Sequence, residues 1–538
     1  MLFSSKNSRP RYTRLHGSSD ALALAQYAAQ HSPLVVIAAN ALEAQRLVEE
    51  IPFFDPKLRV HLLPDWETLP YDHFSPHQDL ISERLATLHH IRSNACDVVI
   101  VPITTALYPL PPVEHLAAYT FFLKRGEKLN VAQLREQLTF AGYNHVQQVL
   151  TPGEYCVRGG IIDLFAMGSV LPYRIDLFDD EIETIATFDV DTQRTLYPVP
   201  EIRLLPAREF PMDEKGQARF RQNFRDRFEG DPSKSRIYKD VSKGIAPAGI
   251  EYYLPLFFDK TATLFDYLPK SATLCLHHEV DEAIATFGKD AASRYNLLRG
   301  DPQHPLLETK ELFLNAEQFF IRAKEFARVD IVANETGATL TPCPTATIPP
   351  IAVDRRAEIP THAFQNFLQS YAGRVLLLAD SLGRREIMSG YLKEYGLTPA
   401  VCEDYASFLA SNEKFMLGVG PIQNGFILLD DNGDASGEPS RAGQDARRRT
   451  ASDETYQIGR RGTSGHATPQ IGHAAGYSKA SIAVVTETEL YASQPRSRAA
   501  RAAKKSNVEG MLRDLSELKV GDPVVHEQHG IARYQGLV

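Results

Sequence analysis

The order of predicted strands and helices is the feature that most constrains the fold. Between residues 20 and 110, β-rich runs at 34–39, 59–63 and 97–101 are separated by segments with helical spacing. Strands separated by helices form a parallel sheet with crossover helices. A chain of 538 residues also divides into three or four domains at about 150 residues each. The pattern therefore predicts an α/β multidomain protein.

A different order of elements begins near residue 120. Strands are predicted at 160–165, 173–178 and 183–188, joined by short polar turns such as Asp179 to Glu181. Consecutive strands on short turns form an antiparallel meander. The alternating pattern resumes after Pro206. We therefore expect a small α+β antiparallel-sheet domain inserted into the first, parallel α/β domain.

The second half of the chain contains a further α/β unit and two unusual segments. The unit begins with a helix at 361–371, a strand at 374–378 and a helix at 382–395. Residues 430–478 have only two large aliphatic side chains, too few to offset the entropy of ordering, so this segment is predicted to be disordered. Strand signals return near residue 522, at the start of a truncated small β-barrel.

Composition excludes several classes of protein. The formal net charge is -9, which argues against a generic nucleic-acid coat, because phosphate binding needs a basic face. No apolar run approaches the ~20 residues of a membrane span. The five dispersed cysteines fit reduced, buried thiols, so we expect a cytoplasmic protein without membrane contact. We also expect no bound metal, and we interpret His277 and His278 as surface or helix residues.

No segment matches a phosphate-binding loop, which needs glycines, a lysine and a hydroxyl. The nearest stretch is Gly17, Ser18, Ser19 and Asp20, which lacks the lysine and carries an acid that would repel phosphate. We interpret it as an ordinary helix N-cap. The run from Leu177 to Glu181 resembles the strand-then-acid pattern of magnesium sites, but we interpret it as a hairpin turn.

Three residues of the meander suggest a protein interface. Arg174 and Phe178 are four residues apart on one predicted strand and project from the same face. Arg158 is expected to open the preceding strand and to lie nearby. Two arginines beside an aromatic ring are typical interface anchors, although an ordinary solvated sheet face remains the alternative.

Several longer motifs carry a family resemblance. The segments 153–165 and 172–183 resemble the interaction domain shared by UvrB and the bacterial transcription-repair coupling factor, Mfd. The segments 65–72, 486–491 and 521–536 resemble the coupling factor and not UvrB. The resemblance covers nearly the whole chain except 430–478.

The resemblance implies a division of the chain and a set of binding residues. Arg158, Arg174 and Phe178 match UvrA-binding positions, and Gly17 to Asp20 match a degenerate phosphate loop in a helicase-like domain. The implied domains are a UvrB-like domain at 1–118 and 207–340, a UvrA-interaction domain at 119–206, a third α/β domain at 345–492 interrupted by 430–478, a basic linker at 493–514 and a truncated RNA polymerase-interacting domain at 515–538. The implied polymerase-binding residues are Val524, Val525, His526, Ile531, Arg533 and Tyr534.

The resemblance also implies a function. We expect a DNA-repair adaptor of transcription-coupled nucleotide excision repair that recruits UvrA to stalled RNA polymerase. The family's ATP-driven translocase motor would be missing, so this fragment would have no catalysis and no cofactor, with ATP and magnesium belonging to the missing module. Contact with the polymerase β subunit would be weak or lost, and DNA would be bound mainly by the motor. Two alternatives remain: an ATP-dependent DNA translocase, and a UvrB-like damage-binding protein with a DNA-clamping hairpin near Tyr71, His73 and Phe74.

Overall fold

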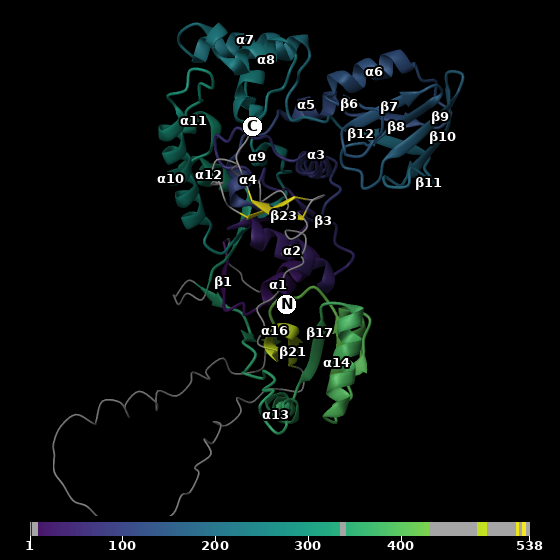
Figure 1. The fold of residues 1–538 in the computed structure, drawn as a ribbon. Coiled ribbons are helices and arrows are strands. Elements are labelled where there is room, and N and C mark those ends of the chain that lie inside the picture. Colours follow the sequence, from purple (N-terminus) through teal and green to yellow (C-terminus); the bar gives the residue numbers. More distant parts are fainter. Residues whose placement is uncertain are drawn as a thin grey trace, which may run out of the picture.

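The computed structural model describes Leu2, residues 9–333, 340–429 and 481–491, and the backbone of 523–526 and 530–533. It is a mixed α/β structure with several sheets (Figure 1). Among the described residues, no helix has both the length and the apolar character needed to cross a bilayer. The predicted disordered segment, 430–478, and the basic linker, 493–514, lie outside the described residues.

The largest sheet is entirely parallel, as the alternating pattern predicts. Its strand order is β15-β1-β14-β13-β2-β4-β3. The strands are β1 (Arg11–Thr13), β2 (Leu34–Ala38), β3 (Val60–Leu62), β4 (Val98–Pro102), β13 (Thr273–His277), β14 (Ala327–Ile331) and β15 (Thr341–Pro342). Since β13 pairs with β2, segments on either side of residues 120–210 contribute to one sheet.

Helices cover this sheet and extend from it. Those before residue 120 are α1 (Ser19–Ala28), α2 (Ala41–Phe54), α3 (Gln78–Arg92), α4 (Ile103–Leu107) and α5 (Val113–Ala118). Those after residue 210 are α7 (Glu214–Arg227), η1 (Pro232–Lys234), α8 (Arg236–Ser242), η2 (Ile250–Phe257), α9 (Leu264–Tyr267), α10 (Val280–Leu298), α11 (Thr309–Leu312) and α12 (Ala316–Ala323). The strands β2 and β4 are buried along their whole length, which explains their unbroken apolar sequences.

A second sheet, which we call the interaction sheet, has the order β11-β10-β9-β8-β7-β6. Its strands are β6 (Asn144–His145), β7 (Glu154–Arg158), β8 (Ile161–Leu164), β9 (Tyr173–Phe178), β10 (Glu181–Phe188) and β11 (Thr195–Pro198). Helix α6 (Val131–Phe140) and the paired strands β5 (Phe121–Lys124) and β12 (Glu201–Leu204) accompany it. The pairs from β7 to β11 are antiparallel, and a two-residue turn joins β9 to β10, as predicted.

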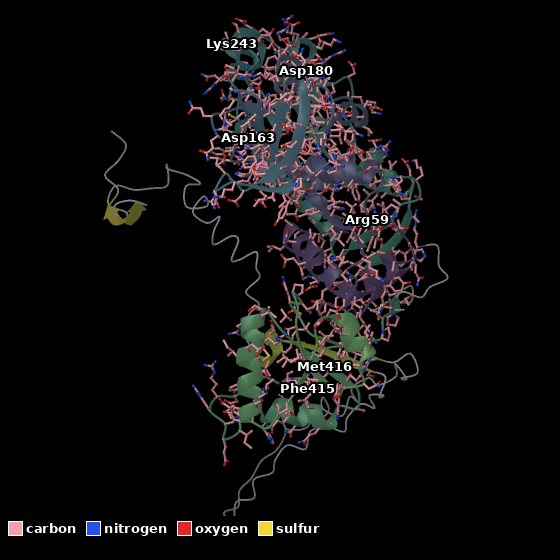
Figure 2. The ribbon with its side chains drawn as sticks, turned by 90° about the vertical axis from the view of Figure 1, so that its right-hand side faces the viewer. Arg59, Asp163, Asp180, Lys243, Phe415 and Met416 are labelled. Carbon is pink, nitrogen blue, oxygen red and sulfur yellow. The ribbon has the colours of Figure 1, made fainter. Side chains whose placement is uncertain are left out.

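The third sheet has the order β16-β20-β21-β17-β19-β18 and lies at the other end of the molecule from the interaction sheet (Figure 2). Its strands are β16 (Thr345–Ala346), β17 (Arg374–Ala379), β18 (Ala400–Val401), β19 (Phe415–Val419), β20 (Phe426–Leu428) and β21 (Ile482–Thr486). Its helices are α13 (His362–Ser370), α14 (Leu382–Glu394), α15 (Tyr405–Ala410) and α16 (Glu487–Tyr491). A separate hairpin pairs β22 (Pro523–His526) with β23 (Gly530–Arg533).

Two expectations from the sequence are wrong in detail. Arg158 was expected to open the strand that precedes β9, but it is the last residue of β7, and β8 begins at Ile161. His277 is the buried last residue of β13, where we expected a surface or helix position. The five cysteines are all buried and unpaired, as predicted.

Candidate functional site

The three predicted interface residues lie on one face of the interaction sheet. Arg158 ends β7, and Arg174 and Phe178 occupy alternate positions of β9. Asp163 of β8 pairs directly with Arg174 across the strands. Both arginines form ion pairs with its carboxylate, at 2.5 Å for Arg158 Nη2 and 2.7 Å for Arg174 Nε. The fold therefore brings the two arginines together.

Asp163 is the residue of this cluster that the sequence-based interpretation missed. Its side chain is 1% exposed, so its charge depends on the two guanidinium groups for compensation. The hydrogen bond with Asp163 raises the pKa of Arg174 above its ordinary value. Its position opposite Arg174 depends on strand register, which residue spacing within one strand does not reveal.

Phe178 differs from both arginines because its ring is 71% exposed. It is the last residue of β9, immediately before the turn to β10. A large apolar side chain exposed on the same sheet face as ion-paired arginines has the composition of an interface anchor. The arrangement can bind a protein surface.

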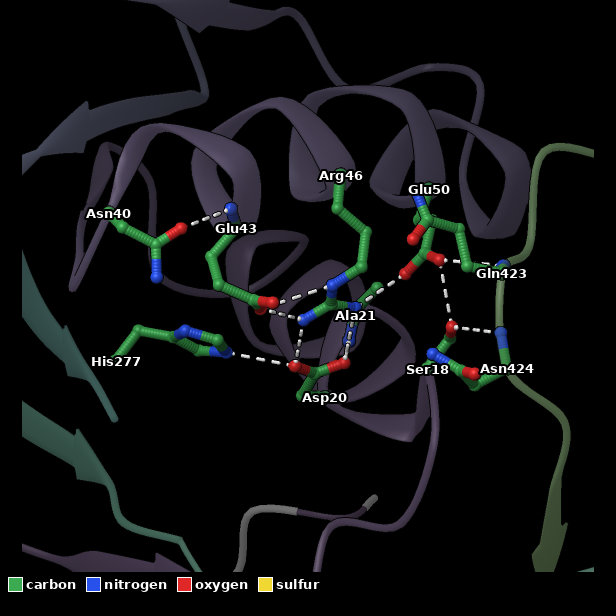
Figure 3. Close-up of polar contacts among 10 residues, drawn as sticks. All are labelled: Ser18, Asp20, Ala21, Asn40, Glu43, Arg46, Glu50, His277, Gln423 and Asn424. Carbon is green, nitrogen blue, oxygen red and sulfur yellow. Dashed lines mark hydrogen bonds and ion pairs between the residues drawn. The ribbon is translucent and has the colours of Figure 1, made fainter. Parts of the chain in front are cut away.

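Another part of the chain packs against the predicted phosphate-loop remnant (Figure 3), and the two together line one side of a cavity of about 480 Å³. Gly17 has a φ of 54°, and a Cβ there would lie 2.2 Å from the carbonyl oxygen of Gly425. The backbone N–H of Ser18 donates to the carbonyl oxygen of Asn424 at 3.0 Å. A backbone N–H at the start of a helix, the type of group that binds phosphate, is therefore used by the third-sheet loop.

Side chains around this loop form a buried ionic cluster, which we call the Arg46 cluster: Asp20, Glu43, Arg46 and Glu50. Arg46 binds Asp20 at 2.5 Å and Glu50 at 2.6 Å. Although burial opposes the shift, Arg46 and His277 lower the pKa of Asp20 well below its usual range. Burial raises the pKa of Glu50 to about 7. Three carboxylates around one guanidinium disfavour a phosphate anion here.

The N-cap interpretation of this segment locates the start of helix α1 correctly, but the capping hydrogen bond that it implies is not formed. Ser18 is the N-cap residue of α1, but its side chain makes no capping hydrogen bond. Its hydroxyl instead donates to Glu50 at 2.8 Å, and Glu50 also accepts from the backbone of Gln423 at 2.9 Å.

Asp20, His277 and His278 have donor atoms close enough to hold a metal ion, a grouping that the sequence-based expectation of no metal did not anticipate. However, Arg46 already neutralises Asp20.

The motif segments that carried the resemblance have structural contacts in this fold. Trp66 donates to buried Glu209 at 3.2 Å, and Tyr71 donates to the carbonyl oxygen of Leu307 at 3.0 Å. Glu489 accepts from the backbone N–H of Gly425 at 2.7 Å and so holds the loop that packs against Gly17. Tyr71, which belongs to the stretch considered for a DNA-clamping hairpin, is buried, and the described residues between 63 and 77 contain no strand.

The predicted polymerase-binding residues are described only in part. Val525 pairs with Ile531 across the hairpin of β22 and β23, and His526 pairs with Gly530. Val524 and Arg533 also belong to this hairpin. Tyr534 lies outside the described residues.

Comparison with known proteins gives matches to three separate segments of the chain. Family models for the "UvrB interaction domain", the "MFD, D3 domain" and the "CarD-like/TRCF RID domain" match residues 121–210, 367–433 and 518–538. Over 97% of its length, the chain is 36% identical to the transcription-repair-coupling factor of Haemophilus influenzae and 35% identical to that of Escherichia coli. The chain matches the N-terminal region of the transcription-repair coupling factors.

The match is spread along the chain, but it covers only part of the relatives. The chain spans 41% of both the Haemophilus and the Escherichia coli coupling factors. The coupling factor of Bacillus subtilis is 24% identical over 94% of this chain and is covered to 40%. The interaction sheet lies inside the segment matched by the UvrB interaction domain model.

Proposed function

We propose that this chain is a DNA-repair adaptor that binds UvrA through the interaction sheet and links it to RNA polymerase in the cytoplasm. The observation that carries the proposal is exposed Phe178 on the same sheet face as Arg158 and Arg174, in a segment that matches the UvrB interaction domain model. The match of 518–538 to the RID model supports polymerase as the second partner. We infer the domain boundaries to be those implied by the sequence resemblance, with the interaction domain at 119–206.

Replacing Phe178 with alanine should weaken UvrA binding by about 1 to 3 kcal/mol, as loss of an exposed interface anchor does. The ring is largely in water in the free protein, so its loss should leave the melting temperature unchanged. Titration of purified UvrA against the immobilised chain measures the affinity.

Tyr197 provides a matched control because it is an aromatic residue of the same sheet that is 65% exposed, on the edge strand β11. The Tyr197→Ala variant should bind UvrA like the wild type. If Phe178→Ala binds with unchanged affinity, the interaction sheet is not the UvrA surface and the proposal is wrong.

An ATP-dependent translocase is the alternative from another functional class. The carboxylates of the Arg46 cluster, and the use of the Ser18 backbone N–H by Asn424, argue against nucleotide binding by this chain, so we propose that it has no ATPase activity and needs no cofactor. We expect no ATP hydrolysis above the blank with duplex DNA, and no binding of a fluorescent ATP analogue. Turnover that is lost in the Asp20→Asn variant would support the alternative.

A further inference from the structure

A cavity of about 380 Å³ lies behind the interaction sheet, beside the ribbon of β5 and β12. Its walls are the loop between β8 and β9, the paired residues Tyr173 and Thr187 of β9 and β10, and Arg203 of β12. Tyr173 and Arg174 are consecutive residues of β9, so their side chains lie on opposite faces of the sheet. The cavity is therefore separate from the face that carries the proposed UvrA-binding residues.

The loop that forms one wall of this cavity is fixed against α3. The backbone N–H of Gly168 donates to the hydroxyl of Ser82 at 2.7 Å. Gly168 has a φ of 79°, and a Cβ there would lie 2.8 Å from the Cβ of Ala86. Only glycine allows this close approach of the loop to the helix. The cavity therefore has a rigid wall at the junction of α3 and the interaction sheet.

Arg203 places a cation in the cavity without an acidic partner. Its side chain is half-buried, and among the residues that the structure describes it has no ion pair and no hydrogen bond. Burial lowers the pKa of Arg203, and Tyr173 is the group that raises it, with no contribution from an aspartate or glutamate. Glu201, two positions earlier on β12, pairs with Lys124 at 3.0 Å. The cavity thus lacks one negative charge.

Other groups at the cavity suit an anion that also carries an apolar part. The hydroxyl of Ser169 donates to the hydroxyl oxygen of Tyr173 at 3.3 Å, which leaves the proton of Tyr173 for a second donor contact. Val170 in the loop wall is 92% exposed, and Phe122, which pairs with Arg203 across the ribbon, is 50% exposed. Covering such apolar surface on binding is favourable.

We propose that this cavity binds a small anionic ligand, with a carboxylate or phosphate group at Arg203 and Tyr173 and an apolar part against Val170 and Phe122. A guanidinium group offers two parallel donors to either kind of anion. The volume lies within the range of about 300 to 1,000 Å³ that is usual for small-molecule sites. This site goes beyond UvrA binding and involves none of the residues proposed for it.

The Arg203→Met variant tests whether the arginine is kept for binding or for stability. Methionine retains an apolar stem and removes a cation that has no anion to compensate it. The melting temperature of the ligand-free protein should therefore stay the same or rise. A variant that melts well below the wild type would show that Arg203 supports the fold, and the proposed site would be wrong.

Calorimetric titration at constant ionic strength measures binding with two pairs of probes. Inorganic phosphate and phenyl phosphate represent a phosphate ligand, and acetate and hexanoate represent a carboxylate ligand. In one of the pairs we expect binding, with the larger probe bound more tightly because of its apolar part. The pair that binds identifies the anionic group. If none of the four probes binds, the proposal is overturned.

The variants assign that binding to the cavity. Arg203→Met should weaken it at least about tenfold, as loss of a charged hydrogen-bond donor does, and Tyr173→Phe about threefold. Arg125→Met is the control, because Arg125 is exposed and its Nε donates to the carbonyl oxygen of Glu183. It should bind the probes like the wild type. Wild-type affinity in Arg203→Met, or an equal loss in Arg125→Met, would contradict the assignment.

Discussion

Replacement of Arg46 with methionine is expected to lower the free energy of unfolding by about 3 to 5 kcal/mol, the usual cost of breaking a buried ion pair from one side. The Arg46 side chain is 8% exposed, and it compensates Asp20 and Glu50, which are buried almost completely. Without it, two carboxylates would remain in a poorly solvated site. Urea unfolding followed by circular dichroism measures the loss.

The loss should depend on pH in a definite direction. In the wild type, Arg46 keeps the pKa of Asp20 low, so this carboxylate stabilises the fold above its unfolded pKa. Without Arg46, the pKa of Asp20 in the folded state rises. The loss of stability then applies while the Asp20 carboxylate is ionised. The difference between variant and wild type should therefore be larger at about pH 8 than at about pH 5.

Arg59 supplies the control because it also pairs with an aspartate, Asp97, but its own side chain is 51% exposed. Exposed ion pairs contribute about 0.2 to 1 kcal/mol, so Arg59→Met should have a small effect. Equal losses of unfolding free energy in Arg46→Met and Arg59→Met would show that burial does not make the ion pairs of Arg46 more stabilising than an exposed pair.

The strands and helices were largely predictable because they depend on local patterns. The buried runs of β2 and β4 and the turn between β9 and β10 follow from apolar continuity and from polar turn residues. The strand β1 was missed because its three residues, Arg11–Thr13, carry no apolar run. His277 was misplaced because a polar side chain in a buried strand breaks the pattern used to find strands.

The contacts of the candidate site depend on residues that are distant in sequence. Glu50 accepts a hydrogen bond from the backbone N–H of Gln423, which is 373 residues away in the sequence, and no pattern around either residue indicates this contact. The predicted interface residues were brought together by the fold, but the role of Asp163 emerged only from the register of β7, β8 and β9. Spacing along one strand identifies a face, whereas the partners on that face come from neighbouring strands.

The second large effect is expected for Arg84→Met, which removes the centre of a buried network that joins α3 to Pro64, Trp66 and Glu209. Arg84 of α3 donates to Glu209 through Nε at 2.8 Å and to the carbonyl oxygen of Pro64 through Nη1 at 2.7 Å. Its guanidinium carbon lies 5.3 Å from the centre of the Trp66 ring. Both ionic side chains are at most 1% exposed.

Loss of Arg84 would leave the Glu209 carboxylate with Trp66 as its remaining side-chain donor among the described residues. We expect a loss of about 3 to 5 kcal/mol in the free energy of unfolding. The Arg84→Met, Glu209→Gln double variant should recover part of this loss, because no unpaired charge remains buried. The control is Arg219→Met, since Arg219 pairs with Asp259 at the surface. A double variant less stable than Arg84→Met alone would show that the charge of Glu209 is not the source of the penalty.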